Sequence, residues 1–301
     1  MTHVATQSVA QGAKGPLIPV LAVVGVGLIG GSAALALRQA GQVGRVLGVG
    51  RNPSSLAQAL ALGLIDEIAT PEQAAAQADV ILLSTPVGGL GAMLARLRQH
   101  LRADSLLTDA GSTKLEVLEA AQAALGDRVN QFVPGHPIAG AERTGPAAAE
   151  ASLYRNRTVI LTPLPENAPS QVGRVRDLWQ ACGARVIEMD AASHDRVLGS
   201  VSHVPHFLAS AYMAQVTMAD DAAQRLALAG SGFRDFTRIA AGSPEMWRDI
   251  FLSNRDALRT ELAAVRAVVD QMERAMLDGD GAALEALLLQ AADARRNWCK
   301  E

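Results

Sequence analysis

Two groups of residues in this sequence could transfer a proton and hold an acidic molecule. His136 stands in the segment Gly135-His-Pro-Ile-Ala-Gly140, and a histidine in an ordered loop rich in glycine and proline is suited to act as a base near neutral pH. Further along the chain, His203 and His206 precede Arg238, whose planar guanidinium can bind a carboxylate through two hydrogen bonds. This combination predicts an enzyme that acts on a small acidic substrate.

A glycine motif indicates the second reactant. Gly25-x-Gly27-x-x-Gly30 follows an apolar run that begins at Leu17, and it precedes an alanine-rich stretch that extends to Ala40. A strand, a tight turn and a helix in this order present the free N–H groups of the helix N-terminus to a pyrophosphate. The motif therefore predicts a dinucleotide site with these cofactor-binding residues: Gly25, Gly27, Leu28, Ile29 and Gly30.

The same stretch could also be interpreted as a membrane span. Residues 15–37 carry no charge, and a spanning helix needs roughly 20 apolar residues. Pro19 and four glycines between residues 25 and 31 interrupt the run, and a second strand, Arg45–Val49, follows it as in a nucleotide-binding βαβ unit. We therefore expect neither a membrane segment nor a signal peptide.

Composition excludes several classes of partner. The net charge of −3 over 301 residues gives no basic surface for nucleic acid. Cys182 and Cys299 are too few for a disulfide framework, which favours a reducing, cytoplasmic location. His194, His203 and His206 lie close together, but no carboxylate follows at a convincing ligand spacing, so we predict no metal site.

The end of the second strand bears on the choice of cofactor. Enzymes that prefer NAD usually carry Asp or Glu about 20 residues after the glycines, where the carboxylate binds the ribose 2′-hydroxyl. This chain has Gly50-Arg51-Asn52 there, and Arg51 could pair with a 2′-phosphate, with Ser54 and Ser55 nearby. Alternatively, Arg51 is a solvated loop residue. We expect NADP to be favoured over NAD.

Strands and helices alternate through the first part of the chain. Polar or glycine-rich segments follow three expected strands, and they are Ser84-Thr85-Pro86, Asp109–Ser112 and Gly135–Gly140. Because ligands bind outside the carboxyl ends of parallel strands, these segments should meet in one crevice. After a leader of residues 1–16, we predict an α/β Rossmann-type domain with a parallel sheet over residues 17–190, and cofactor contacts from Ser84, Thr85 and Pro86.

The last third of the sequence contains no strand signal. Leu258, Leu262, Val265, Val269, Met272 and Met276 recur at the spacing of one apolar helix face. This pattern predicts an all-α domain over residues 191–301. The apolar face could pack within that domain or against a second copy, and we favour a homodimer.

Taken in order, the motifs resemble those of the prephenate/arogenate dehydrogenase family of tyrosine biosynthesis. The similarity extends from about residue 17 to 298 and rests on these segments: Gly25–Gly30, Asp109-Ala-Gly-Ser112-x-Lys114, Gly135–Gly140 with Glu142, His194-Asp195, Ser202-His203-Val-Pro-His206, Gly232–Ala240 and Ser243–Trp247. The resemblance implies a nucleotide-binding domain followed by an all-α dimerisation domain. The implied reaction is the oxidative decarboxylation of prephenate or arogenate, to 4-hydroxyphenylpyruvate or tyrosine, with hydride transfer to NAD(P)⁺.

The resemblance also implies roles for individual residues. His136 would be the catalytic histidine bonded to the ring hydroxyl, with Ser112 assisting it, and Arg238 would hold a substrate carboxylate. His206 would line the substrate pocket, and we place Ser202 and His203 of the same segment among the substrate-binding residues. Some relatives carry a fused chorismate mutase or a C-terminal regulatory domain, and here we expect neither. We therefore expect no allosteric inhibition through such a module, whereas direct competition by tyrosine at the active site stays open.

Two other functions are compatible with the glycine motif. A β-hydroxyacid dehydrogenase or related NADP-linked reductase usually uses a helical lysine in its second half, but no lysine occurs between Lys114 and Lys300. A non-catalytic NADP-sensing regulator would explain the glycines and Arg51, yet it would not explain His136 together with Arg238.

Overall fold

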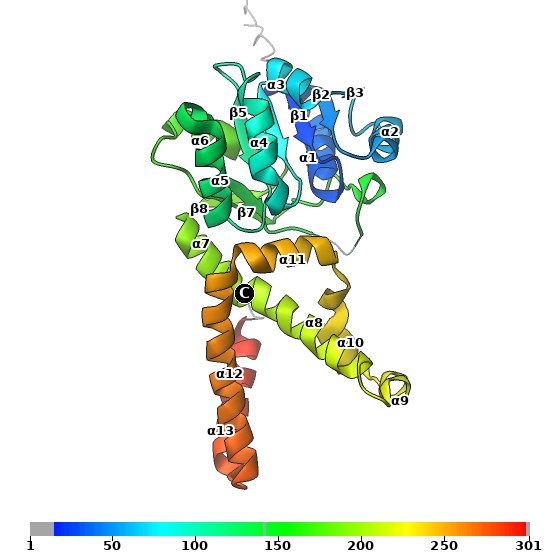
Figure 1. Cartoon of the computed structure of the whole chain (residues 1–301), viewed down its shortest axis with the longest axis vertical. Coiled ribbons are helices and arrows are strands. Elements are labelled where there is room, and N and C mark those ends of the chain that lie inside the picture. The colour runs from blue at the N-terminus through cyan, green and yellow to red at the C-terminus, as the bar shows by residue number, and fades with distance from the viewer. Residues whose placement is uncertain (1–14, 141–142, 299–301) are drawn as a thin grey trace, which may run out of the picture. The chain divides into compact units, whose positions relative to one another are not determined.

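The computed structural model describes residues 15–140 and 143–298 (Figure 1). Most of the predicted leader, the motif residue Glu142 and the last three residues lie outside this range. The described chain divides into two compact units. One contains the residues up to His194 together with Gly242–Ser253, and the other contains Asp195–Ala241 and the residues from Asn254 onward.

A five-stranded parallel sheet forms the centre of the first unit. Its strand order is β3-β2-β1-β4-β5, with β1 as Ile18–Val24, β2 as Val43–Val49, β3 as Glu67–Ile68, β4 as Val80–Leu83 and β5 as Leu106–Asp109. Strand β1 pairs with β2 on one side and β4 on the other, so Val24 is opposite both Val49 and Leu83. The parallel register brings the carboxyl ends of these strands to one edge, as the alternation of strands and helices predicts.

Helices cover both faces of this sheet. Side chains of β1 alternate between two hydrophobic clusters, with Leu21 and Val23 in one and Ala22 and Val24 in the other. The first cluster includes residues of α1 (Leu28–Gln39), α2 (Pro53–Ala61) and α6 (Pro169–Ala181). The second includes residues of α3 (Pro71–Gln77), α4 (Leu90–Arg98) and α5 (Leu115–Leu125), and α3, α4 and α5 form consecutive contacts on that face.

A second, smaller sheet departs from the single parallel sheet expected from the sequence. It has the order β6-β7-β8, and β6 (Gly135–Pro137) runs antiparallel to β7 (Thr158–Leu161), whereas β8 (Arg185–Glu188) runs parallel to β7. His136 is opposite Ile160. Three residues that include a glycine and a proline carry no strand signal of their own, which is why the sequence indicated only a loop here.

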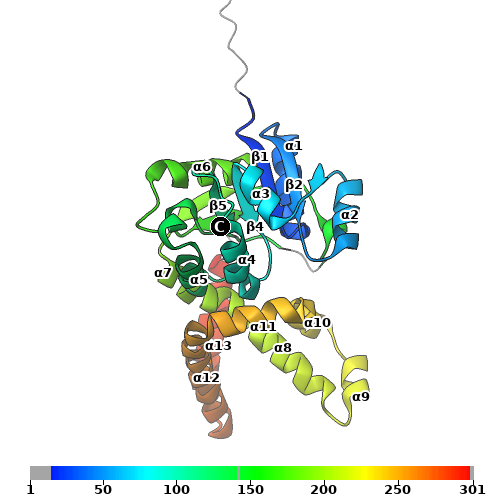
Figure 2. The ribbon, with the colours of Figure 1, turned by 45° about the horizontal axis from the view of Figure 1, so that its top comes forward.

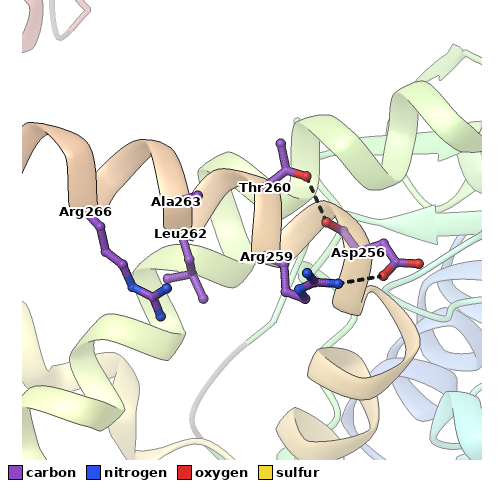
Figure 3. Close-up of a pocket in the computed structure, with 6 residues that line it drawn as sticks. All are labelled: Asp256, Arg259, Thr260, Leu262, Ala263 and Arg266. Atoms are coloured by element: carbon purple, nitrogen blue, oxygen red, sulfur yellow. Dashed lines mark hydrogen bonds and ion pairs between the residues drawn. The ribbon is translucent and has the colours of Figure 1, made fainter.

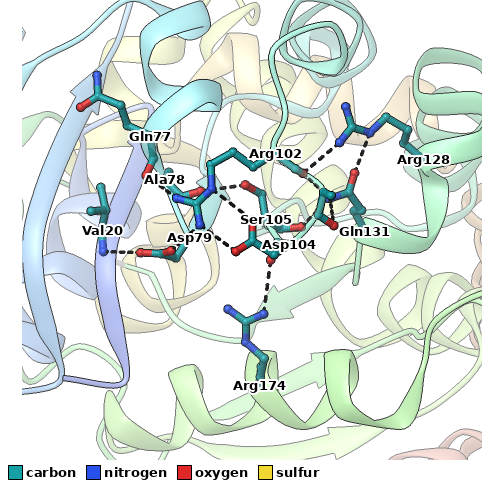
Figure 4. A network of polar contacts seen from close by, with 11 residues as sticks. Val20, Gln77, Ala78, Asp79, Arg102, Asp104, Ser105, Arg128, Gln131 and Arg174 are labelled. Atoms are coloured by element: carbon teal, nitrogen blue, oxygen red, sulfur yellow. Dashed lines mark hydrogen bonds and ion pairs between the residues drawn. The ribbon is translucent and has the colours of Figure 1, made fainter. Parts of the chain in front are cut away.

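A polar network fixes the amino-terminal edge of the large sheet (Figure 4). One carboxylate oxygen of Asp79 accepts the N–H of Val20 at 2.8 Å, and the other accepts Arg102 Nη2 at 2.9 Å. Arg102 also donates to the carbonyl of Gln77, and the buried amide of Gln131 donates to the carbonyl of Arg102. The network holds the strands β1 and β4 together at the edge opposite the glycine motif.

One helix belongs to the first unit although it comes late in the sequence. Helix α11 (Pro244–Ser253) begins directly after Ser243, whose Oγ accepts the N–H of Met246, and it packs on the short turn Val87–Gly89 after β4. The sequence-based boundary at residue 190 assigned this segment to the second domain. The helix lacks its own core, with Ile250 as its one buried residue among those described.

The regular secondary structure in the described part of the second unit is all helical. Helix α7 (Ala191–Leu198) crosses into it and continues through a π-helical segment, Gly199–His203, into α8 (Val204–Thr217). The other helices are α9 (Ala222–Ala227), α10 (Ser231–Thr237), the 3₁₀ turn Arg238–Ala241, α12 (Arg255–Leu277) and α13 (Gly281–Trp298). Helices α12 and α13 lie side by side (Figures 1 and 2).

Candidate active site

The glycine turn after β1 has the geometry that the motif predicts. Gly25 has φ +94°, and a Cβ at that position would lie 2.7 Å from the carbonyl oxygen of Ser84. A Cβ at Gly30 would lie 2.5 Å from Val23 Cγ1, so Gly30 permits the close packing of α1 on β1. At Gly27, by contrast, a Cβ would meet no described atom within 4 Å. Two glycines therefore shape the turn, and the third leaves space in front of it.

That space suits the pyrophosphate of a dinucleotide. Helix α1 begins directly after Gly27, no side chain of the described residues caps it, and its first turn contains no acidic residue. The N–H groups of Leu28 and Ile29 belong to this first turn, where the helix dipole favours an anion. The hydroxyl of Tyr154 donates to the carbonyl of Ile29 at 2.6 Å and fixes the turn from behind.

The segment after β4 lines the same turn. Ser84 Oγ donates to the carbonyls of Gly25 and Val24, at 2.8 and 3.2 Å, so this predicted cofactor residue closes the glycine turn. The hydroxyl of Thr85 is buried and has no hydrogen-bond partner among the described residues. A buried hydroxyl of this kind is available to a ligand. Together with partly buried Pro86, these residues fit the edge of a dinucleotide site.

Arg51 lies at the end of β2, in the position that the sequence suggested. Its side chain is 86% exposed, and its guanidinium is 3.9 Å from the carboxylate of Glu245 on α11. Asn52 is occupied as the cap of α2, because its side-chain oxygen accepts the N–H groups of Ser54 and Ser55. Among these residues, the guanidinium of Arg51 is the group positioned to meet an anion.

A buried ion pair fixes the strand that carries His136. Lys114 and Asp109 have fully buried side chains, and Lys114 Nζ is 2.5 Å from Asp109 Oδ2. Lys114 Nζ also donates to the carbonyl of Gly135 at 2.7 Å, while Asp109 Oδ1 accepts the N–H of Gly135 at 3.0 Å. Both backbone groups of the residue before His136 are therefore held by one ion pair. The sequence contained both residues in its Asp109–Lys114 motif but gave no signal that they pair.

His136 contacts a second histidine. Its Nδ1 lies 2.8 Å from Nε2 of His194, with the ring centroids 5.1 Å apart and the rings inclined by 62°. His136 is 8% exposed and His194 is fully buried. His194 lies in the first turn of α7, where Asp190 accepts the N–H of Ser193 through its side chain and that of His194 through its carbonyl. The two histidines are 58 residues apart in the sequence, so their contact could not be predicted from it.

Ser112 lies in the short segment between the ion-pair residues. It is partly buried, and its neighbour Thr113 is fully buried, with its hydroxyl 2.7 Å from that of Ser253 at the end of α11. The loop after β5 is thus held on both sides of Ser112, by Thr113 and by the bond from the N–H of Gly111 to Asp109 at 2.8 Å.

The predicted substrate residues His206, Ser202 and Arg238 lie in the second unit. His206 Nδ1 is 2.9 Å from the carbonyl oxygen of Ser202, across the junction between the π-helical segment and α8. Burial lowers the pKa of His206 below 6.5, the bond to Ser202 opposes this shift, and the positive charge of Arg238 adds to it. Arg238 is exposed and lies at the start of the 3₁₀ turn Arg238–Ala241.

His203 has a different environment. It is 1% exposed, and its Nδ1 is 3.0 Å from Nδ2 of Asn254. Asn254 also donates to the carbonyl of Asp195 in α7 at 2.7 Å, so its amide joins α7 and the segment that follows it to the start of α12. These bonds indicate that His203 helps to hold the helices of the second unit together. Substrate binding by His203 stays a prediction.

Other kinds of site are not found in the described part of the chain. No group of three or more His, Cys, Asp or Glu residues is arranged to hold a metal ion. Burial raises the pKa of the Cys182 thiol to about 12, so it is not a nucleophile near neutral pH. Within residues 15–140 and 143–298, no helix has both the length and the apolar character needed to cross a membrane.

A surface hollow of about 570 Å³ lies along α12 (Figure 3). It is lined by Asp256, Arg259, Thr260, Leu262, Ala263 and Arg266. Arg259 is paired with Asp256 at 3.8 Å, and Thr260 donates to the Asp256 carbonyl at 3.0 Å. None of these residues belongs to the predicted site, and we assign the hollow no ligand.

Comparison with known protein families identifies both halves of the chain. The family model for the prephenate dehydrogenase nucleotide-binding domain matches residues 33–188, and the model for the prephenate dehydrogenase dimerization domain matches residues 190–290. Together the two models cover most of the chain, in the order predicted from the sequence.

Individual relatives agree with the family models. The chain is 36% identical over 257 residues to prephenate dehydrogenase of Bacillus subtilis, which covers 82% of this chain and 69% of that protein. It is 33% identical to cyclohexadienyl dehydrogenase of Zymomonas mobilis over 87% of this chain and 89% of that one.

A solved structure extends this likeness to three dimensions. The crystal structure of prephenate dehydrogenase from Aquifex aeolicus in complex with hydroxyphenyl propionate and NAD⁺ superposes with a TM-score of 0.87 at 33% identity, over 93% of this chain and 98% of the other. The protein therefore belongs to the prephenate dehydrogenase family, and it is a nicotinamide-dependent dehydrogenase of tyrosine biosynthesis, as its sequence predicts.

Proposed function

We propose that this enzyme oxidises and decarboxylates prephenate, with His136 as the base that removes the proton of the C4 hydroxyl. The observation that carries the assignment of His136 is its placement. It is a nearly buried histidine on β6, held through Gly135 by the Asp109–Lys114 pair. A base fixed in this way loses little entropy when it meets its substrate.

The reaction requires little more of the protein than orientation and proton transfer. His136 Nε2 takes the hydroxyl proton as the C4 hydride leaves, the ring carboxylate departs as CO₂, and its electron pair makes the ring aromatic. The protonated His136 then returns the proton to the phenolate oxygen. When bound, the nicotinamide ring accepts the hydride. Ser112, in the loop that Thr113 and Asp109 fix, would donate a hydrogen bond to the same substrate oxygen.

The second unit would supply the groups that bind the acidic parts of the substrate. Arg238 is exposed and carries a positive charge that is felt at His206. We assign Arg238 to a substrate carboxylate, and His206 to the pocket as a neutral hydrogen-bonding group, since burial favours its uncharged form. We also assign Ser202 and His203, in the preceding turn, to substrate binding. We propose arogenate as a second substrate, because a solved structure that is 30% identical to this chain is that of Synechocystis arogenate dehydrogenase.

For the cofactor, we propose that NADP is favoured over NAD. No carboxylate follows β2 directly, and the exposed guanidinium of Arg51 can donate hydrogen bonds to a 2′-phosphate. Glu245 opposes this preference, because its carboxylate lies 3.9 Å from the guanidinium of Arg51 and would repel a 2′-phosphate bound there. The preference should therefore be moderate. The pyrophosphate would lie at Gly27 and the start of α1.

We also propose a homodimer formed through the second unit, in the cytoplasm. Several large apolar side chains of α12 and α13 are exposed, and they are Val268, Val269, Met276, Leu277, Leu288, Leu289 and Trp298. An apolar surface of this kind marks a protein interface. The predicted seam is buried at Leu258 and Leu262 but exposed at Val269 and Met276, which leaves its second half for the partner.

The test is turnover with each substrate and cofactor. Purified enzyme is mixed with prephenate or arogenate and with NADP⁺ or NAD⁺, and absorbance of the reduced nicotinamide is followed. We expect kcat/KM to be highest with prephenate and NADP⁺, and Arg51→Ala to lower the NADP/NAD ratio. A ratio that favours NAD and does not respond to Arg51→Ala would refute the cofactor proposal, and no turnover with either acid would refute the assignment of substrate.

A further inference from the structure

The hydrogen bond between His136 and His194 can form in either direction, and its direction determines whether His136 can act as a base. The two facing nitrogens, Nδ1 of His136 and Nε2 of His194, are 2.8 Å apart, so one of them carries the hydrogen and the other accepts it. A neutral imidazole has one N–H and one lone pair. The nitrogen that donates in this bond therefore determines which face of the His136 ring is left for the substrate.

Only one arrangement leaves His136 able to act as a base. If His136 donates from Nδ1, its Nε2 carries a lone pair and can take a proton from a substrate hydroxyl. If His194 donates from Nε2, the hydrogen of His136 resides on its own Nε2, and that ring can donate a bond but not accept a proton. With the same distance between the rings, Nε2 of His136 is therefore a base in the first case and a hydrogen-bond donor in the second.

We propose that His194 is a positioning residue for catalysis, which accepts the Nδ1–H of His136 and so sets the tautomer whose lone pair is on Nε2, the nitrogen that receives the substrate proton. This inference rests on the proposed role of His136 as base. When His136 takes up the proton, it still donates from Nδ1 to His194, so the contact persists throughout the reaction. His194 stays neutral, because a second positive ring 2.8 Å away in a buried setting would be strongly unfavourable.

The surroundings of His194 suit this function. Its side chain is fully buried, and its backbone is fixed in the first turn of α7 by Asp190. On the other ring, the Asp109–Lys114 pair fixes the strand of His136 through Gly135. Both imidazoles are thus held by their own backbones, which allows a single hydrogen bond to set the orientation and the tautomer.

Two substitutions separate the hydrogen bond from simple packing. In His194→Gln, the side-chain oxygen can accept the Nδ1–H of His136, whereas in His194→Phe the ring volume is kept and the acceptor is lost. We expect His194→Phe to lower kcat by about 10- to 100-fold, in the range seen when a hydrogen-bonded supporting partner is removed. KM for both substrates should change little, and His194→Gln should recover most of kcat.

A purely structural role predicts a different pattern, in which both variants lose thermal stability and kcat falls in parallel with the folded fraction. Equal kcat values for His194→Phe and wild type would overturn the proposal. So would a failure of His194→Gln to exceed His194→Phe while both remain folded by circular dichroism.

The tautomer of His136 can also be determined by NMR, independently of any measurement of activity. In the full-length protein with ¹⁵N-labelled histidine, the ring signals of His136 are identified by their loss in His136→Asn. We expect neutral His136 to carry its hydrogen on Nδ1 in wild type. A hydrogen on Nε2 would overturn the role of His194, whereas undiminished activity of His136→Asn would instead refute His136 as the base, so the two failures are distinguishable.

Discussion

Replacing Lys114 by methionine should destabilise the first unit far more than an ordinary charge deletion. The substitution keeps much of the side-chain volume but removes the 2.5 Å contact to Asp109 and the 2.7 Å bond to the carbonyl of Gly135. Asp109 then remains as a fully buried carboxylate without its cation. Breaking a buried pair by removing one partner costs about 3–5 kcal/mol, so we expect a loss of this size in the free energy of unfolding.

The natural control is an ion pair of the same type at the surface. Arg98 and Asp127 lie 2.8 Å apart, but their side chains are 45% and 81% exposed. Arg98→Met should cost much less than Lys114→Met, because solvent screens an exposed pair. Urea unfolding followed by tryptophan fluorescence measures both variants, since Trp179 lies in the core of the first unit.

A double variant distinguishes the ion pair from generic damage to the core. In Lys114→Met with Asp109→Asn, neither buried charge remains, and the loss should be smaller than the sum of the two single losses by about 1–3 kcal/mol. Additive losses, or a Lys114→Met cost no larger than that of Arg98→Met, would refute the reasoning. Because Gly135 precedes His136, the single variants should also lower kcat in the fraction that stays folded.

Three further outcomes are expected. Arg238→Gln should raise KM for prephenate by a factor corresponding to roughly 2–3 kcal/mol, with nucleotide affinity unchanged in a binding titration; weaker nucleotide binding would contradict its assignment. Gly50→Asp should shift the ratio of catalytic efficiencies toward NAD relative to Gly50→Ala, since a carboxylate there repels a 2′-phosphate. The atoms nearest to the new Cβ belong to the flexible side chain of Leu56, at 3.3 Å, and an unchanged ratio would place the ribose elsewhere. The pKa of His206 in NMR titrations should lie below 6.5, because burial and then the charge of Arg238 lower it. The stability that the neutral form of His206 provides is therefore present above about pH 6.5 and is lost as the pH falls. Arg238→Gln should raise the pKa of His206.

The parts of this structure that depend on local pattern could be predicted from the sequence. The glycine spacing predicted the turn at Gly25 and the open approach at Gly27, because φ and the room for a Cβ are local properties. The alternation of apolar runs predicted the parallel sheet, and the change of period near residue 190 predicted the helical unit.

Features that depend on distant residues could not be predicted in this way. Strand β6 is too short to have a pattern, and it exists because β7 supplies its hydrogen bonds. Helix α11 lies in the first unit because its partner is the turn after β4, which is more than 150 residues away in sequence. The pairing of His136 with His194 also depends on tertiary packing, although both residues stood out individually.

Replacing His136 by asparagine tests the central claim most directly. Hydride transfer is measured in a single turnover with saturating prephenate and NADP⁺, beside the exposed His100→Asn as a control in the same unit. If His136 is the base, its replacement should slow hydride transfer by about 10²- to 10⁴-fold, with substrate and nucleotide affinity nearly unchanged and with His100→Asn at the wild-type rate. Hydride transfer at close to the wild-type rate in His136→Asn would contradict the account.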